Sequence, residues 1–254
     1  MYLEMPGDLA APYKSPAQRA RVVTEGWGEK NLYCANCSSP HLLRAAANAQ
    51  VIDFTCPDCA HPFQLKSQSR PFSARIVDAA YSAMRDAIQE GRTPSLLALH
   101  YDPLRWSVLN LILLPRFVFT LSCLERRKPL GSGARRHGWV GCNIVLTSIP
   151  PDARIPIVSE GHVARASEVR ERFARLRPLE GLRHEARGWT LDVLNVLRGI
   201  GQKEFTLTEG YAFEGELARL HPANRFVRPK IRQQLQTLRR MGLVEFLGQG
   251  RYRL

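Results

Sequence analysis

The spacing of apolar residues predicts helices and strands that alternate along most of the chain. Apolar side chains recur at helical intervals over 15–27 and 73–91, and a charged amphipathic segment predicts a further helix over 168–179. The stretch 181–188 is expected to be a linker. Strand-like runs occupy 50–54, 62–67, 96–102, 108–114, 143–147 and 154–159. This order predicts an α/β (α+β) fold in which helices flank a mixed sheet.

The C-terminal part has a different order of elements. Helical patterns over 189–201 and 227–242 flank the stretch 204–222, which predicts a short strand followed by a helix. The last residues, 243–254, predict a hairpin with a Gly-x-Gly tip. Three helices and a basic terminal hairpin describe a winged helix, so we expect a small domain of this type after the mixed sheet.

The chain carries a strong excess of positive charge. Its 254 residues include 36 Lys and Arg against 23 Asp and Glu, which gives a net charge of +13. An excess of this size favours a polyanionic partner, above all nucleic acid. The most apolar stretch, 106–119, is too short to cross a membrane and is interrupted by Pro115 and Arg116. Since the N-terminus also lacks the features of a secretory signal, we expect a cytoplasmic protein with no membrane partner.

Four of the six cysteines have the spacing of a zinc site. Two CxxC pairs, separated by 18 residues, are formed by Cys34, Cys37, Cys56 and Cys59. In a reducing cytosol such pairs are expected to bind metal rather than form disulfides, and four thiolates favour structural Zn²⁺. His61 is an alternative ligand that four cysteines make unnecessary. Cys123 and Cys142 have no partner at metal spacing and are expected to be buried thiols.

A candidate site for a second metal lies on both sides of the later CxxC pair. Asp53 is predicted to end an apolar strand, and Gln64, Leu65 and Lys66 lie on the next one, where Gln64 and Lys66 share a face. Asp53, the Gln64 amide oxygen and the Leu65 carbonyl could hold Mg²⁺, and Lys66 could act on the attacking water in phosphodiester hydrolysis. Zinc bound in the connection would then fix the relative position of these ligands. A surface strand with polar residues is the commoner origin of such a pattern, and both interpretations stay open.

A glycine-bracketed loop over 128–142 carries Arg135, Arg136, His137 and Trp139. Arginine pairs with phosphates and guanine edges, and an indole can contact a base edge, so the loop is a candidate for reading DNA. The alternative is an exposed loop whose Trp139 is tucked into the core.

The helix predicted over 227–242 has one apolar and one polar face. Ile231, Leu235 and Leu238 form an apolar stripe at helical spacing. The opposite face offers the candidate DNA-binding residues Arg228, Lys230, Arg232, Gln233 and Gln236. Arginine pairs with guanine and glutamine with adenine in the major groove, and Arg251 and Arg253 on the hairpin are expected to contact DNA as well. A winged helix that binds protein is the alternative, which this concentration of Arg and Gln disfavours.

Several segments, spread over nearly the whole chain, match a known family in order and spacing. They are YCANC (33–37), DFTCPDC (53–59), LKS (65–67), RKPLGSGARRHGWVGCNI (127–144), GWTLDVLN (188–195) and IRQQLQTLRR (231–240). Together they resemble the DpnI-type methyl-directed restriction endonucleases. The resemblance implies a restriction-endonuclease-like domain of the PD-(D/E)xK type with an inserted zinc module over 1–181, followed by a winged-helix domain over 182–254.

The resemblance also implies an activity. In that family both domains recognise GATC when its adenine carries an N6-methyl group, and the product is a blunt double-strand break. The expected protein is thus a Mg²⁺-dependent type II enzyme that acts on double-stranded DNA as a monomer, with Asp53 as a metal ligand and Lys66 as the catalytic lysine. The methyl group projects into the major groove, where an apolar surface such as Trp139 can sense it.

The chain departs from the family at Gln64, where the family has a glutamate. An amide keeps an oxygen ligand but loses a charge, so the affinity for Mg²⁺ should fall. Glu25 could supply a compensating carboxylate, although an ordinary surface glutamate is the expected interpretation. We expect a working enzyme and keep two alternatives: a reader of N6-methyladenine DNA that cuts weakly or not at all, and, more distant, a zinc and winged-helix transcription regulator.

Overall fold

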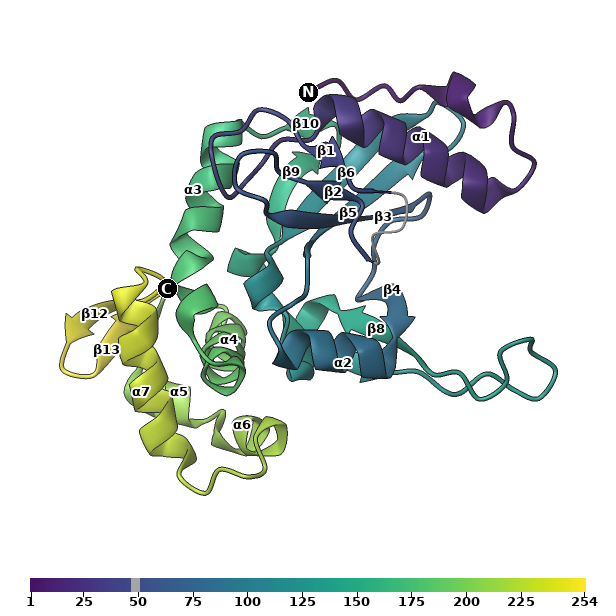
Figure 1. Ribbon diagram of the computed structural model, residues 1–254. Helices are drawn as coiled ribbons and strands as arrows, with labels where there is room; N and C mark the ends of the chain where they lie inside the picture. Colours follow the sequence, from purple (N-terminus) through teal and green to yellow (C-terminus); the bar gives the residue numbers. More distant parts are fainter. Residues whose placement is uncertain (47–50) are drawn as a thin grey trace. The chain divides into compact units, whose positions relative to one another are not determined.

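The computed structural model has a seven-stranded mixed sheet in the N-terminal part of the chain, as predicted. The strands lie in the order β1-β2-β3-β5-β6-β9-β10 (Figure 1). In this sheet β3 and β5 run parallel, and the other neighbouring pairs are antiparallel. The strands are β1 Leu43–Arg44, β2 Phe54–Thr55, β3 Pro62–Gln68, β5 Ser95–Asp102, β6 Ser107–Leu114, β9 Ile155–Ser159 and β10 His162–Val163.

The burial of the strands follows their place in the sheet. Strand β5, in the middle, has the nearly continuous apolar sequence SLLALHYD, of which all but the last residue is buried. A strand covered on both faces requires such a run. Phe54 and Phe63 face each other across β2 and β3 and are fully buried, so the core of the sheet extends to the hairpin that carries the second CxxC pair.

The structure describes residues 1–46 and 51–254. Two compact units are interleaved along the sequence, one formed by 1–73, 93–116 and 154–174, the other by 74–92, 117–153 and 175–254. The predicted boundary between residues 181 and 182 stays a prediction. The strand predicted over 50–54 is wrong except at its end, because residues 51–53 are not in a strand and β2 begins at Phe54; residue 50 lies outside the described residues.

Helix α1 (Pro16–Asn31) confirms the predicted N-terminal helix and extends it beyond residue 27. Pro16 occupies the first turn, whereas Ser15 makes no side-chain cap hydrogen bond. Val23 and Trp27 are fully buried, and the Trp27 indole Nε1 donates to the Tyr2 carbonyl at 2.8 Å. The preceding 3-10 turn is η1 (Gly7–Ala10).

Helix α1 packs directly against β2 and β3. A Cβ atom at Gly28 would lie 2.7 Å from Phe54 Cζ, so the helix can come this close to β2 only because residue 28 is glycine. Thr24 Oγ1 lies 3.2 Å from Ser67 Oγ at the end of β3. The face of α1 between these contacts therefore lies beside the Asp53 and Gln64–Lys66 segments.

A three-stranded antiparallel sheet in the second unit corrects one prediction. Its order is β4-β8-β7, and the strands are β4 Arg75–Ala80, β7 Leu124–Arg126 and β8 Gly141–Val145. The helix predicted over 73–91 is therefore wrong in its first half, and α2 spans only Tyr81–Gln89. Residues 75–78 alternate between exposed and buried, and β4 pairs with β8, which is distant in sequence. This pairing overrides the helical spacing.

A winged helix forms the C-terminal part of the second unit. Its elements are α4 His184–Arg198, β11 Glu204–Thr206, α5 Leu207–Tyr211, α6 Glu214–Leu220, α7 Val227–Arg240, β12 Glu245–Gly248 and β13 Arg251–Arg253 (Figure 1). The strands form a small sheet in the order β11-β13-β12. As predicted, Ile231, Leu235 and Leu238 of α7 are buried.

Two details of this region differ from the predictions. The linker predicted over 181–188 is wrong, because α4 already begins at His184, and Trp189 stacks on His221 at 3.9 Å between ring centroids. The single helix predicted within 204–222 is divided into α5 and α6.

The remaining helical segments are short or follow the predictions. The predicted helix over 168–179 is α3, and no described helix is long and apolar enough to cross a membrane. These segments are α3 Ala166–Leu176, η2 Arg116–Val118, η3 Leu121–Cys123, η4 Leu146–Ser148, η5 Pro151–Ala153 and η6 Arg177–Gly181.

A polar cluster joins the three strands of the β4-β8-β7 sheet and predicts a pH effect. Hydrogen bonds from Arg75 (2.7 and 2.9 Å) and then from Asn143 (2.7 Å) lower the pKa of Glu125 from 4.5 to about 2. Because the folded-state pKa is lowered, the cluster stabilises the protein fully above pH 4.5 and loses this effect as the pH falls towards 2. The difference in unfolding free energy between the parent protein and Glu125→Gln should therefore shrink over that interval. A difference that stays constant from pH 5 to pH 2 would contradict the ionised pairing.

Candidate functional site

The four cysteines of the two CxxC pairs form one compact cluster. All four sulfur atoms lie within 4.8 Å of one another, with Cys34 Sγ 3.7 Å from Cys59 Sγ and Cys37 Sγ 3.5 Å from Cys56 Sγ. A tetrahedral Zn²⁺ with four thiolates places its sulfur atoms about 3.8 Å apart, given Zn–S bonds of about 2.3 Å. Burial raises the pKa of the Cys34 thiol well above its ordinary value, so a thiolate there needs a cation beside it. The donor set fits a divalent metal ion.

The cluster sits at the turn of the β2–β3 hairpin and is fixed from outside by α3. The hairpin is closed by Cys56 N donating to His61 O at 3.0 Å. Arg170 of α3 donates to the backbone carbonyl of Cys34 at 3.0 Å and to those of Ser38 and Ser39 at 3.2 and 3.0 Å. The sequence predictions missed Arg170, since no local pattern connects it to the first CxxC pair.

His61 and the two remaining cysteines lie outside the cluster. His61 Nε2 lies 2.7 Å from Ser95 Oγ, and its ring packs against Phe173. Cys123 and Cys142 are buried, as predicted.

The candidate magnesium ligands are brought together at the open end of the same hairpin. Asp53 was predicted to end a strand. This is wrong, because Asp53 lies immediately before the first residue of β2. Its backbone is held on both sides, by Asp53 N donating to Phe63 O and by Ala45 N donating to Asp53 O, each at 2.9 Å. Its side-chain oxygen Oδ2 accepts a hydrogen bond from Leu65 N at 2.7 Å. The carboxylate of Asp53 therefore lies against the backbone of the Gln64–Lys66 segment.

The surroundings of Asp53 are partly buried and contain charges of both signs. Burial raises the pKa of Asp53 above its ordinary value, the Leu65 N–H opposes this rise, and the nearby Glu25 carboxylate adds to it. Arg21 and Lys66 are close enough to lower it. A half-buried carboxylate next to a second acid is an environment in which a bound cation is stabilised.

The other residues of the candidate magnesium site lie on β3. The prediction for Glu25 on α1, an ordinary surface glutamate, is wrong. Gln64 and Lys66 are half-buried and two residues apart on β3, so their side chains leave the same face of the sheet. Glu25 is not an ordinary surface glutamate, because only 9% of it is exposed. The burial comes from the packing of α1 on the hairpin, which a sequence pattern does not reveal.

The loop between β7 and β8 extends from its sheet as a long arm (Figure 1). Two hydrogen bonds of 2.9 Å, Leu130 N to Trp139 O and Gly138 N to Leu130 O, pair its two sides. Arg135 and Arg136 near its tip are exposed. Trp139 is half-buried rather than in the core, and its ring lies over Gly141, where a Cβ would be 2.8 Å from Trp139 Cη2.

The polar face of α7 presents its residues to solvent, as predicted. Arg228, Arg232, Gln233 and Gln236 are exposed, and Lys230 is half-buried. The guanidinium groups of Arg228 and Arg232 lie 5.4 and 5.6 Å from the ring centroid of Tyr211, and Arg228 also pairs with Glu214 at 2.7 Å. This face carries both donors and acceptors of the kind that read base edges.

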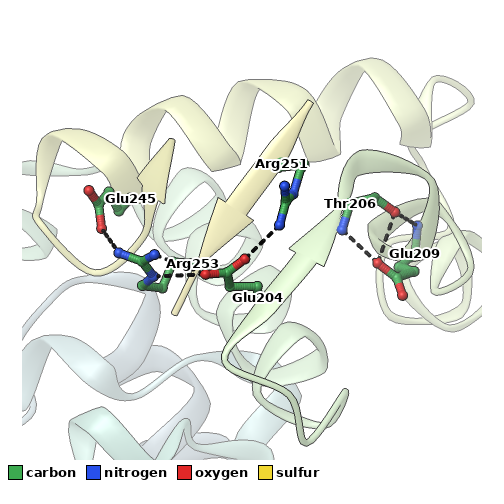
Figure 2. Close-up of polar contacts among 6 residues, drawn as sticks. All are labelled: Glu204, Thr206, Glu209, Glu245, Arg251 and Arg253. Atoms are coloured by element: carbon green, nitrogen blue, oxygen red, sulfur yellow. Dashed lines mark hydrogen bonds and ion pairs between the residues drawn. The ribbon is translucent and has the colours of Figure 1, made fainter. Parts of the chain in front are cut away.

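The two arginines of strand β13, in the C-terminal hairpin, form ion pairs with acidic residues of the small β11-β13-β12 sheet (Figure 2). Arg251 pairs with Glu204 at 2.8 Å, and Arg253 pairs with Glu204 at 2.9 Å and with Glu245 at 3.1 Å. Both arginines are exposed, so they stay accessible to a phosphate, but DNA would have to compete with these carboxylates. The sequence predictions did not include this competition.

A winged helix with an exposed row of Arg and Gln residues has the architecture of a DNA-binding domain. Residues 1–181 match the DpnI family model, described as the Dam-replacing family, and residues 185–254 match the model of the Dam-replacing HTH domain. The chain belongs to the Dam-replacing family. Membership implies a restriction endonuclease and suggests one that depends on DNA methylation.

Proposed function

We propose that the protein is a type II restriction endonuclease that cleaves double-stranded DNA at GATC sites with N6-methylated adenine, acting as a monomer and using Mg²⁺. Family membership supports the class of enzyme. The hydrogen bond from Leu65 N to Asp53 Oδ2 supports the position of the site, because it holds the carboxylate against the strand that carries Gln64 and Lys66. In this proposal Asp53, Gln64 and Lys66 would form a PD-(D/E)xK nuclease site in which glutamine occupies the second acidic position.

In this proposal the ligands of Mg²⁺ are Asp53, the side-chain oxygen of Gln64 and the carbonyl of Leu65. All three are hard oxygen donors, the class that Mg²⁺ prefers. Bound Mg²⁺ would polarise the scissile phosphodiester and balance the charge that develops on it. Lys66 would orient the attacking water and take part in its deprotonation, since its ammonium group lies within electrostatic reach of Asp53.

The zinc module would have a structural role. Four thiolates leave no open coordination position for substrate, so Zn²⁺ at Cys34, Cys37, Cys56 and Cys59 would stabilise rather than react. Its position at the closed end of the β2–β3 hairpin would fix the two strands whose other ends carry Asp53 and Lys66.

Recognition of methylated DNA would use two separate surfaces. On the arm, Arg135 and Arg136 would contact phosphates or guanine edges, and Trp139 would offer an apolar surface to the methyl group. On the winged helix, the base-reading side chains would come from the exposed face of α7, and Arg251 and Arg253 would contact the DNA backbone.

A second function deserves a test because of Gln64. Without the family's glutamate, the site has one carboxylate fewer with which to hold Mg²⁺. The protein would then bind methylated DNA and cut it weakly or not at all.

A plasmid assay separates the two functions. Adenine-methylated and unmethylated plasmid are incubated with the protein in Mg²⁺ and in Mn²⁺, and the products are examined for fragments. Fragments from methylated DNA alone are the expected result, and Gln64→Glu should increase the rate in Mg²⁺ because a second carboxylate strengthens the site.

Two other results would redirect the proposal. A methyl-dependent gel shift without fragments in either metal would overturn the nuclease and leave the reader. Equal cutting of both plasmids would contradict the methyl dependence while leaving the nuclease.

A further inference from the structure

Glu25 is a buried carboxylate that binds two arginines from different parts of the chain. Its Oε1 accepts from Arg21 Nε at 2.6 Å, one turn earlier on α1, and its Oε2 accepts from an Nη atom of Arg44 at the end of β1. The Glu25 side chain is 12% exposed, whereas those of Arg21 and Arg44 are 71% and 46% exposed. The acid thus lies inside, and the two guanidinium groups lie between it and solvent.

Both arginines lie next to the candidate magnesium site. Arg44 is in register with Phe54, the neighbour of Asp53, and Ala45 N donates to the Asp53 carbonyl. Arg21 is close enough to Asp53 for each charge to affect the other. Arg21 and Lys66 therefore lie within electrostatic reach of the Asp53 carboxylate, and Arg44 lies on the strand that pairs with the segment beside it.

This geometry does not favour Glu25 as a replacement for the family's glutamate. Each of its oxygens already accepts a hydrogen bond from a guanidinium group, so a metal ion would have to displace an arginine. Guanidinium groups have five N–H donors, and one contact to Glu25 leaves others for a second acceptor. Their planar fork matches the oxygens of a phosphate.

We propose that Arg21 and Arg44 bind the DNA backbone phosphates beside the bond cut at Asp53, and that Glu25 is the positioning residue that holds both arginines in place. The proposal rests on the proposed function, since it assumes that DNA lies across the Asp53 site. Neither arginine was a candidate from the sequence, because the partner that connects them is buried.

DNA binding at different salt concentrations tests the two arginines. Fluorescence anisotropy with a short methylated GATC duplex is measured in Ca²⁺, so that binding is separated from cleavage. Arg21→Met and Arg44→Met should each lower the affinity about tenfold and reduce the salt slope by about one. Arg19→Met is the matched control, because it removes an exposed arginine from the same helix two residues away. It should change the affinity by no more than about twofold.

The variant Glu25→Gln tests the positioning role, because a purely electrostatic effect and the loss of positioning would change DNA affinity in opposite directions. Removing a negative charge near DNA should by itself tighten binding, whereas loss of the positioning carboxylate should weaken it. We expect weaker binding. The affinity of the free protein for Mn²⁺, measured by calorimetry, should stay within about twofold, because Glu25 is not a ligand in this proposal.

The contrary results are distinct. Tighter DNA binding by Glu25→Gln, or a drop in Mn²⁺ affinity of about tenfold or more, would overturn the positioning role, and the latter would make Glu25 a metal ligand. Unchanged binding by both exposed arginine variants would overturn the phosphate contacts, and these variants are not expected to disturb folding. If the parent protein binds methylated and unmethylated duplexes equally, the methyl dependence in the proposed function fails, while the arginine variants still decide this inference.

Discussion

Replacing Lys66 with alanine is expected to reduce the cleavage of adenine-methylated DNA by about 100-fold or more, because the attacking water loses its positioned proton-transfer partner. The measurement is a single-turnover rate on a methylated GATC duplex in Mg²⁺. Binding of the same duplex in Ca²⁺ should change little in comparison, since Lys66 is half-buried beside Asp53 and lies far in sequence from both candidate reading surfaces.

Lys14→Ala is the control for loss of a lysine. Lys14 is exposed, lies just before α1, and has no role in the proposed mechanism. Cleavage by Lys66→Ala at a rate close to that of Lys14→Ala would remove Lys66 from the mechanism. It would also remove the PD-(D/E)xK assignment of the site.

Replacing Cys56 with serine is expected to release the metal and to destabilise the β2–β3 hairpin severely. Structural Zn²⁺ sites contribute on the order of 10 kcal/mol of apparent binding free energy to folding, and a missing thiolate removes much of it. Metal analysis of the parent protein should give about one Zn²⁺ per chain, as expected for a four-thiolate site. Cys56→Ser should lose the metal, and its melting temperature should fall.

Cys123→Ala is the matched control for this variant. Cys123 is as buried as Cys56 but lies outside the cluster, so the metal content should not change. A zinc-free Cys56→Ser protein that still cleaved methylated DNA at the parental rate would contradict the role of the four-cysteine cluster in placing Asp53 against Leu65. A parent protein without zinc would contradict the assignment of the cluster itself.

The sequence by itself determined those features that depend on neighbours along the chain. Two CxxC pairs place four thiolates by local turn geometry, and the structure brings all four together. The stripe of Ile231, Leu235 and Leu238 follows from the helical period, and these residues are buried in α7 as expected. The apolar run over 96–102 likewise predicted a strand, which the structure confirms as β5.

Tertiary structure decided the features that depend on contacts between distant segments. Residues 75–80 form a strand because β8 pairs with them, although their apolar spacing also suits a helix. Packing between elements that are far apart in sequence buries Glu25 and pairs it with Arg44. It also brings Arg170 within hydrogen-bond distance of the backbone at the first CxxC pair.

The candidate site combines both kinds of information. Sequence spacing named Asp53, Gln64, Leu65 and Lys66 as members, but the hydrogen bond between Asp53 and Leu65 exists only because a hairpin folds the two segments together. Residue types and short spacings thus determined which chemical groups the protein carries. Which of them meet, and which are buried, was decided by long-range pairing and packing, because these depend on surfaces that no local stretch of sequence contains.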